Sequence, residues 1–318
     1  MLNGGRVKRG IQRVVLALTN RRICRRLGDV PYLKIKFWAF LGRRLDLKHP
    51  RSFNEKMQWL KINYYDERLP RMVDKYAVRE YIREWIGEEY LVPLLGVWDR
   101  AEEIDWDSLP DRFVLKCTHG SHTNIICTDK AKLDRAAAAE TLDRWLDDEW
   151  TYYFGREWPY LQVKPRIIAE AFIESDEPGG IRDYKFLCFH GKPDNMMICS
   201  NRQIGQVSFD HFTRDWKLIR CQCVDQAKPA DYTVPPPPRA EEMFAVAEKL
   251  AAHFPFVRVD LYCEHDRIYF GELTFFPASG FDTDYSREGD MRFGSLIRLE
   301  AFARDRGAIQ KIKQGRTV

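Results

Sequence analysis

The spacing of apolar residues predicts helices through the first third of the chain. Residues 50–108 repeat Trp, Tyr, Glu and Lys at helical spacing. Ser52 precedes Glu55 by three residues, a capping-box pattern that begins a helix running through Leu60. Another helix is expected from Asp74 to about Trp85. Nearer the start, apolar residues fall on roughly one helical face among arginines: Ile11, Val14, Val15, Leu18 and Ile23.

Short apolar runs bounded by small or polar residues predict strands in the rest of the chain. The expected strands are residues 113–117, 125–127, 166–173, 184–189, 196–199, 206–209, 257–263 and 267–273. The turn 177–180 joins strand 166–173 to strand 184–189, and the two runs after them continue the sheet. The last two strands form a hairpin around Glu264-His265-Asp266. Helices complete the pattern of an α/β or α+β fold, at residues 131–150, residues 239–252 and the charged tail.

Composition supports a packed, reduced protein. Of the 318 residues, 45% are apolar and 13% aromatic, enough for a core and too many for global disorder. The longest uncharged stretch near the start, Val14–Asn20, has seven residues, whereas a membrane span needs about twenty. No secretory cleavage site follows it. Eight scattered cysteines without a Cys-x-x-Cys pair favour free thiols in a cytoplasmic protein over disulfides or a zinc site.

Charge is uneven, with a basic N-terminal arm before a mildly acidic body. Residues 1–48 contain 13 Lys or Arg and 2 Asp or Glu, a net +11, and the remainder contains 38 and 45, a net −7. Such an arm suits an anionic membrane surface, contacted through residues 6–48, or packing on its own body. No nucleic-acid-binding module accompanies it, so no nucleic-acid partner is expected. The expected location is the cytoplasm, with peripheral contact at the inner membrane face as an open alternative.

The final hairpin places charged side chains on one surface. Arg258, Asp260 and Tyr262 alternate on one strand face, and Glu272 and Thr274 share a face of the next strand. Burying such charges is costly unless they pair or bind a cation. Mg²⁺ prefers one or two carboxylates together with phosphate oxygens and water, so Asp260 and Glu272 predict a magnesium site. A structural Arg–Asp–Glu network is the alternative.

Two further runs are suited to a nucleotide. Lys116 lies in a strand that leads into the hydroxyl-rich turn Thr118–Asn124. Backbone N–H groups of such a turn can surround phosphate oxygens while the ammonium neutralises charge. An ordinary hairpin with an edge lysine is the alternative. The apolar strand 167–173 could offer its backbone to a purine edge, and an acid after it could hold ribose, although two ordinary strands explain this run better when it is taken alone.

Other patterns are weaker. Asp105-Trp106-Asp107 and Asp282-Thr283-Asp284 both match the Asp-x-Asp pattern of glycosyltransferases that use nucleotide sugars. Two matches in one chain show how common that pattern is. His119 and His122 could form a metal pair, but solvated loop histidines are the more ordinary interpretation.

Five stretches carry a family resemblance: Ser52–Leu60, Asp74–Arg79, Phe113–Asn124, Asp183–Gly191 and Phe270–Gly280. Each is short, but together and in this order they resemble the ATP-grasp superfamily and, within it, the TupA-like branch, named for teichuronopeptide biosynthesis. The resemblance covers about residues 50–290 and leaves residues 1–48 outside.

The resemblance implies two α/β lobes that hold ATP and one or two Mg²⁺ ions between them. It assigns the metal to Asp260 and Glu272, with Thr274 at a position where superfamily members often have Asn. Arg258 would stabilise the transferred phosphoryl group, with Lys185 as a second contact of the γ-phosphate. The other implied contacts are Lys75 and Lys116 for the phosphates and adenine side, His119, Gly120, Ser121, His122, Thr123 and Asn124 in the phosphate loop, Glu170, Ala171, Phe172 and Ile173 at the adenine hinge, and Asp183 for ribose.

The implied activity transfers phosphate from ATP to a carboxylate, after which an amine attacks the acyl phosphate and an amide forms. The TupA-like association with cell-surface polymers makes a uronic acid or an acidic peptide the expected carboxylate and an amino acid the expected amine. A nucleotide-sugar glycosyltransferase using Asp282 and Asp284 and a non-catalytic nucleotide-binding protein are the alternatives. The expected domains are a basic arm (1–48), a helical domain (49–110), an ATP-grasp domain (111–300) and a charged tail (301–318).

Overall fold

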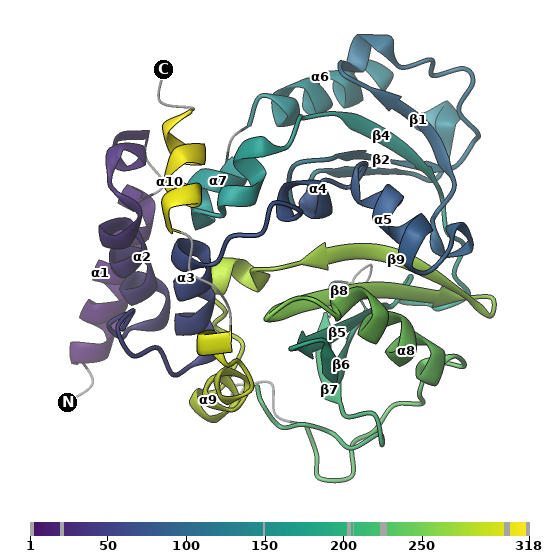
Figure 1. The fold of residues 1–318 in the computed structure, drawn as a ribbon. Helices are drawn as coiled ribbons and strands as arrows, with labels where there is room; N and C mark the ends of the chain where they lie inside the picture. The colour runs from purple at the N-terminus through teal and green to yellow at the C-terminus, as the bar shows by residue number, and fades with distance from the viewer. Residues whose placement is uncertain are drawn as a thin grey trace.

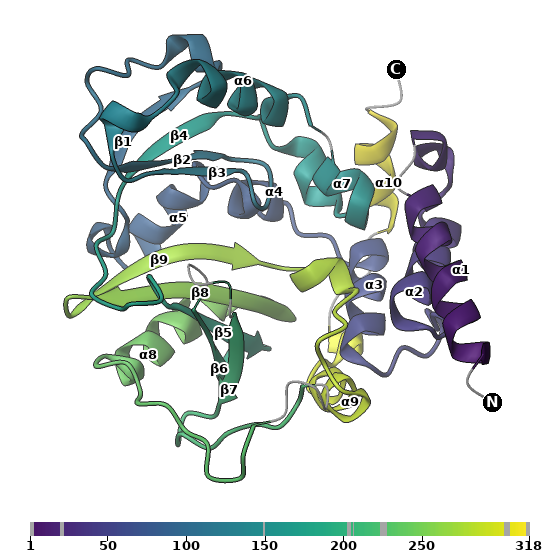
Figure 2. The same ribbon diagram turned by 180° about the vertical axis from the view of Figure 1, so that it is seen from behind.

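The computed structural model describes residues 3–19, 22–148, 150–201, 205, 207–222, 228–301 and 306–315. Within this part of the chain, two antiparallel sheets face each other and helices pack around both (Figure 1, Figure 2). The mixed fold expected from the sequence is therefore confirmed.

The first sheet has the strand order β1-β4-β2-β3. Its strands are β1 (Leu94–Trp98), β2 (Phe113–Cys117), β3 (Asn124–Cys127) and β4 (Ile167–Ala171). Helix α6 (Arg135–Leu146) covers one face, where Leu142 and Leu146 belong to the same apolar cluster as Phe113 of β2. Because side chains alternate along a strand, Lys116 and Glu170 lie on the opposite face, toward the second sheet.

The second sheet has the strand order β7-β6-β5-β8-β9. Its strands are β5 (Asp183–Phe189), β6 (Lys192–Ser200), β7 (Ser208–Phe212), β8 (Phe256–Glu264) and β9 (Arg267–Thr274). Helix α8 (Ala240–Ala251) covers one face, where Phe244 meets Phe186 edge to face with ring centroids 5.0 Å apart. The neighbouring residue Lys185 consequently faces the first sheet.

The other helices gather mainly beside the sheets (Figure 1). Helices α1 (Asn3–Thr19), α2 (Asp29–Leu41), α3 (Phe53–Asn63) and α10 (Arg306–Gln314) form a layer at one end, and an ion pair between Lys313 and Asp29 ties α10 to α2. The remaining helices are α4 (Leu69–Val73), α5 (Val78–Trp85), α7 (Trp150–Gly155) and α9 (Arg287–Ser295). Across the described residues, no helix combines the length and the apolar character needed to cross a membrane.

Three expectations from the sequence need correction. Strands β4 and β5 do not share a sheet, because β4 is already paired with β1 and β2 on its two edges, and β5 with β6 and β8. The strand expected at residues 206–209 runs from Ser208 to Phe212. Ile23 does not continue the first helix: α1 ends at Thr19, whose hydroxyl donates to the Leu16 carbonyl at 2.9 Å, and Ile23 lies in a separate 3₁₀ turn.

The segment expected to be helical, residues 49–110, also supplies strand β1 to the first sheet through pairing with β4. The boundaries proposed for the four domains stay a prediction. The cysteines that the structure describes are free thiols.

Candidate active site

A cleft of about 760 Å³ lies between the two sheets. Both sheets, the turn after β2 and the segment after β9 contribute to its wall. Most of the residues expected in a nucleotide site line it: Lys75, Lys116, Ser121, His122, Thr123, Asn124, Glu170, Asp183, Lys185, Arg258, Asp260, Glu272 and Thr274.

The second sheet contributes a compact charged cluster. Lys185, Asp260 and Glu272 are register partners across β5, β8 and β9 and so share one face. Arg258 contacts both oxygens of Asp260, at 2.6 and 2.7 Å, and donates to Glu272 Oε1 at 2.9 Å. Lys185 Nζ donates to Asp260 Oδ2. The hairpin therefore brings Arg258, Asp260 and Glu272 together, as the alternation predicted, and β5 adds Lys185.

Electrostatic effects on the two acids differ. Burial raises the pKa of Asp260, which is 1% exposed, even though Arg258 and Lys185 oppose the change. For Glu272, burial also acts upward, but the charges of Arg258, Lys185 and Lys75 outweigh it and lower the pKa to about 2. Glu272 is therefore a carboxylate under all physiological conditions.

Thr274 has its hydroxyl engaged within the cluster. Its Oγ1 donates to Glu272 Oε1 at 3.0 Å and accepts from Arg258 Nη2 at 3.0 Å. This position fits a residue that orients Glu272, and whether it also contacts metal stays a prediction.

The first sheet brings a second set of charges to the cleft. Lys116 Nζ donates to Glu170 Oε2 at 2.6 Å, and Arg79 Nη1 donates to Glu170 Oε1 at 3.0 Å. Lys75 Nζ donates to the Gly120 carbonyl at the turn after β2. Burial lowers the pKa of Lys75, and Glu272 on the opposite sheet opposes that shift.

Some expected residues lie outside the cleft wall. His119 is turned away, with Nε2 3.0 Å from the Trp145 carbonyl oxygen. Gly120 contributes its carbonyl to Lys75, and the Ala171 N–H donates to the Pro93 carbonyl at 2.9 Å. The Phe172 ring holds the Arg112 guanidinium 4.1 Å from its centroid. The adenine-hinge role of residues 170–173 stays a prediction.

Two carboxylates of the cleft, Asp260 and Glu272, are the groups that could bind a divalent ion. Among the described residues, no group of three or more His, Cys, Asp or Glu side chains could hold a metal by itself. Asp260 and Glu272 provide two carboxylates side by side on paired strands. Two carboxylates fit Mg²⁺ when nucleotide phosphates supply its other ligands. The residues present therefore suit a nucleotide-bound ion.

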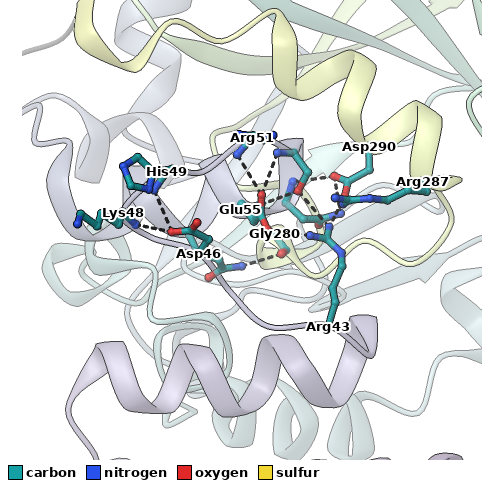
Figure 3. A network of polar contacts seen from close by, with 12 residues as sticks. Arg43, Asp46, Lys48, His49, Arg51, Glu55, Gly280, Arg287 and Asp290 are labelled. Atoms are coloured by element: carbon teal, nitrogen blue, oxygen red, sulfur yellow. Dashed lines mark hydrogen bonds and ion pairs between the residues drawn. The ribbon is translucent and has the colours of Figure 1, made fainter.

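A network of polar contacts joins the start of helix α3 to Arg43 and Asp290 (Figure 3). Ser52 and Glu55 form the predicted capping box. Asn54 accepts from the Asp282 N–H at 2.8 Å and donates to the Asp282 carbonyl at 3.1 Å. The buried Asp290 accepts from Asn54 and pairs with Arg43. This network fixes Asp282, which lines the cleft.

Several cleft residues were not anticipated from the sequence. They include Glu157, Tyr160, His211, Gln222 and Tyr285. Asp282 and Asp284 also line the cleft, but Asp282 Oδ1 accepts from the Asp284 N–H at 2.9 Å, as in an ordinary turn.

A model of the TupA-like ATP-grasp family matches residues 55–298. The chain belongs to the TupA-like ATP-grasp family. Membership confirms the family and the ATP-grasp fold expected from the sequence. No curated protein sequence matches the chain.

Solved structures similar to this ATP-grasp protein have low identity to it. A D-alanine–D-alanine ligase from Bacillus anthracis is 14% identical, with 77% of this chain and 66% of that chain covered and a TM-score of 0.42. An L-amino acid ligase from Bacillus licheniformis is 13% identical, with 66% and 44% covered and a TM-score of 0.42. The chain thus spans less than two thirds of the length of either ligase.

Proposed function

We propose that this protein joins a carboxylate to an amine through an acyl phosphate made from ATP. The observation that supports this most directly is the pairing of Asp260 and Glu272 beside Arg258 and Lys185, in a cleft that Lys116 lines from the opposite sheet. Opposed cations and a pair of carboxylates suit a triphosphate with its divalent ion.

The nucleotide would lie between the sheets. Lys75 and Lys116 would contact its phosphates and adenine side, the turn 119–124 would close over the phosphates, and Asp183 would hold the ribose. Lys116 now pairs with Glu170, and phosphate oxygens are alternative acceptors for the same ammonium group. Nucleotide binding is therefore expected to exchange this ion pair for phosphate contacts.

The chemistry needs placement and charge neutralisation more than covalent help from the protein. Oxide is a poor leaving group from a carboxylate, and phosphate is a good one, which explains the use of ATP. A Mg²⁺ ion held by Asp260 and Glu272 would neutralise charge on the nucleotide phosphates. Arg258 would stabilise the transferred phosphoryl group, and Lys185 would contact the γ-phosphate.

The TupA-like family makes cell-surface polymer synthesis the proposed setting. The carboxylate would be a uronic acid of a polysaccharide or an acidic peptide, and the amine an amino acid. The turn geometry at Asp282 and Asp284 gives no support to a glycosyltransferase site.

Product formation tests the proposal. The purified protein with ATP, Mg²⁺ and a panel of uronic acids, oligouronides and acidic peptides is offered hydroxylamine or each of the twenty amino acids. Hydroxamates and amides, with one ADP and one phosphate per bond formed, are expected. ATP consumption that yields neither product, or no ATP consumption with any member of the panel, would contradict the ligase proposal.

We also propose that the basic arm contacts an anionic membrane surface. Six of the ten large apolar side chains exposed in the described residues lie between positions 11 and 35: Ile11, Val14, Leu18, Leu27, Val30 and Ile35. The inner side of α1 packs on α2, where Gln12 Nε2 donates to the Trp38 carbonyl at 3.3 Å. Exposed Arg13, Arg26 and Lys34 accompany the apolar side chains, a combination that suits anionic lipid.

Vesicle sedimentation tests the membrane contact. Binding to phosphatidylglycerol vesicles and not to phosphatidylcholine vesicles is expected, with a loss of at least tenfold in Val14→Asp. Ile126→Asp is the matched control, because Val14 and Ile126 are 59% and 56% exposed in different parts of the fold. Equal binding by both variants, or none by the unaltered protein, would overturn this assignment.

A further inference from the structure

A buried histidine lines the cleft on the side away from β9. His211 on β7 pairs with Met197 on β6, which pairs with Lys185 on β5. Direct partners in antiparallel strands share a face, so His211 stands in one row with Lys185 and Asp260. About 14 Å, three strand spacings, separates His211 from Asp260 along this row. All four side chains line the cleft.

A chain of hydrogen bonds orients the imidazole. Arg292 holds both carboxylate oxygens of Asp194, at 2.9 and 3.0 Å. Asp194 Oδ2 accepts from Asn195 Nδ2 at 2.9 Å. This fixes the amide of Asn195 so that its Oδ1 accepts from His211 Nδ1 at 2.8 Å. The proton of the neutral ring is therefore assigned to Nδ1, and Nε2 keeps a free electron pair.

The other ring nitrogen, Nε2, is left without a protein partner in the part of the chain that the structure describes. None of the described residues forms a hydrogen bond with His211 Nε2. The residue is 1% exposed, and burial lowers its pKa to about 4 although the charge of Asp210 opposes this. An uncharged, oriented acceptor nitrogen that lines a cleft without a partner is what a general base requires.

Two aromatic rings pack beside the imidazole of His211. The rings of Tyr285 and Phe293 each lie 5.8 Å from the His211 ring, centroid to centroid. Burial raises the pKa of Tyr285, and the nearby charge of Arg258 opposes that change. Tyr285 is therefore within electrostatic reach of Arg258, and both residues line the same cleft as His211.

We propose that the cleft between β7 and the loop 281–285 binds the amine substrate, and that His211 Nε2 takes its proton. This inference rests on the proposed ligase function. The amine nitrogen attacks the acyl carbon with its electron pair, the bond from that carbon to the phosphate oxygen breaks, and phosphate leaves with the bonding electrons. The N–H proton passes to Nε2, and the imidazolium later returns it to water. A weak base suffices, because the nitrogen of the tetrahedral adduct is positively charged and more acidic than a free ammonium.

The tautomer is tested without any substrate. Nitrogen NMR of the full chain labelled with ¹⁵N-histidine, with His211→Gln to assign the signals, reports which ring nitrogen carries the proton. A protonated Nδ1 and a bare Nε2 are expected at pH 7 and still at pH 5.5. A proton on Nε2, or a charged ring at pH 7, would overturn the proposal.

The catalytic role is tested by comparing two nucleophiles on one acyl phosphate. Hydroxylamine is uncharged at neutral pH and needs little help from a base, whereas an amino acid needs one. In His211→Gln, the ratio of amide to hydroxamate is expected to fall at least 100-fold. In His253→Gln, the same substitution at an exposed histidine outside the cleft wall, the ratio should stay within threefold.

The outcomes separate this inference from the ligase proposal. Equal loss of both products in His211→Gln would show a merely structural role, and loss of neither would show that another group takes the proton. Failure of the unaltered protein to form any hydroxamate would refute the ligase function itself, and the tautomer measurement would then still decide the state of His211.

Discussion

Replacing Glu272 with Gln removes one negative charge from the proposed metal site with little change in shape. Gln keeps an oxygen that can accept from Thr274 and Arg258, the two hydrogen bonds of the present carboxylate. The amide cannot neutralise a divalent ion as a carboxylate does. The substitution therefore separates the contribution of Glu272 to folding from its contribution to ATP chemistry.

The two contributions differ greatly in size. A pKa of about 2 against an ordinary 4.5 corresponds to about 3 kcal/mol between the charged and neutral forms at full strength. The side chain is 40% exposed, so solvent screening reduces this to about 1 kcal/mol of stability. For a chain of this length, that lowers Tm by roughly 1–2 °C. Loss of one preorganised charge from a phosphoryl-transfer site lowers the rate by about 10²–10³.

ADP release under saturating Mg²⁺ and ATP, together with a thermal unfolding scan, measures both effects on the same sample. Glu248→Gln is the matched control. Glu248 lies on helix α8, outside the cleft wall, and pairs with the exposed Lys192 of β6. The control is expected to keep full activity. If Glu272→Gln retains more than a third of the original turnover while folded, the metal assignment is wrong.

Three further predictions follow from buried groups. Asp260→Asn removes the carboxylate that pairs with both Arg258 and Lys185 and leaves Lys185 only the more distant Asp183, at 3.8 Å. About 3–5 kcal/mol of stability should therefore be lost, and Tm in a calorimetric scan should fall by about 5–7 °C; an unchanged Tm would contradict the pairing. His211 binds a proton in the unfolded chain near pH 6.5 but in the folded protein only near pH 4, so stability should decrease as pH falls between these values, by about 3 kcal/mol in total. Urea unfolding at pH 7 and pH 4 should show that this part of the loss is absent in His211→Gln, and equal losses in both proteins would refute it. Asn54→Ala leaves the backbone N–H and carbonyl of Asp282 without their side-chain partner and removes one hydrogen bond to the buried Asp290, which keeps Arg43. Urea unfolding should therefore show a loss of about 2–3 kcal/mol, and a loss under 0.5 kcal/mol would contradict the role given to Asn54.

Local patterns in the sequence were sufficient to predict the hairpin that carries the charged cluster. Alternation along 257–263 and 267–273 predicted that Asp260 and Glu272 would share a face, and the two are register partners. The capping box at Ser52 and Glu55 is likewise present. Both features depend on residues close together in the chain or on one tight turn, so their geometry is fixed by period and spacing.

Local patterns could not predict the contacts between segments that lie far apart in the chain. Strand propensity marks β4 and β5 as strands without saying which edges they pair with, and the two belong to different sheets. Asn54 and Asp290 are 236 positions apart, and no local period links them. His211 was missed because the strand was expected to end at residue 209, whereas it runs to Phe212 and joins a row that crosses three other strands.

The most direct test of the account is a crystal structure of the protein with a non-hydrolysable ATP analogue and Mg²⁺. The account predicts the triphosphate between the sheets, at least one Mg²⁺ ion within bonding distance of both Asp260 and Glu272, and Lys116 on a phosphate oxygen. A nucleotide bound elsewhere, or a metal in the cleft that contacts neither carboxylate, would contradict it.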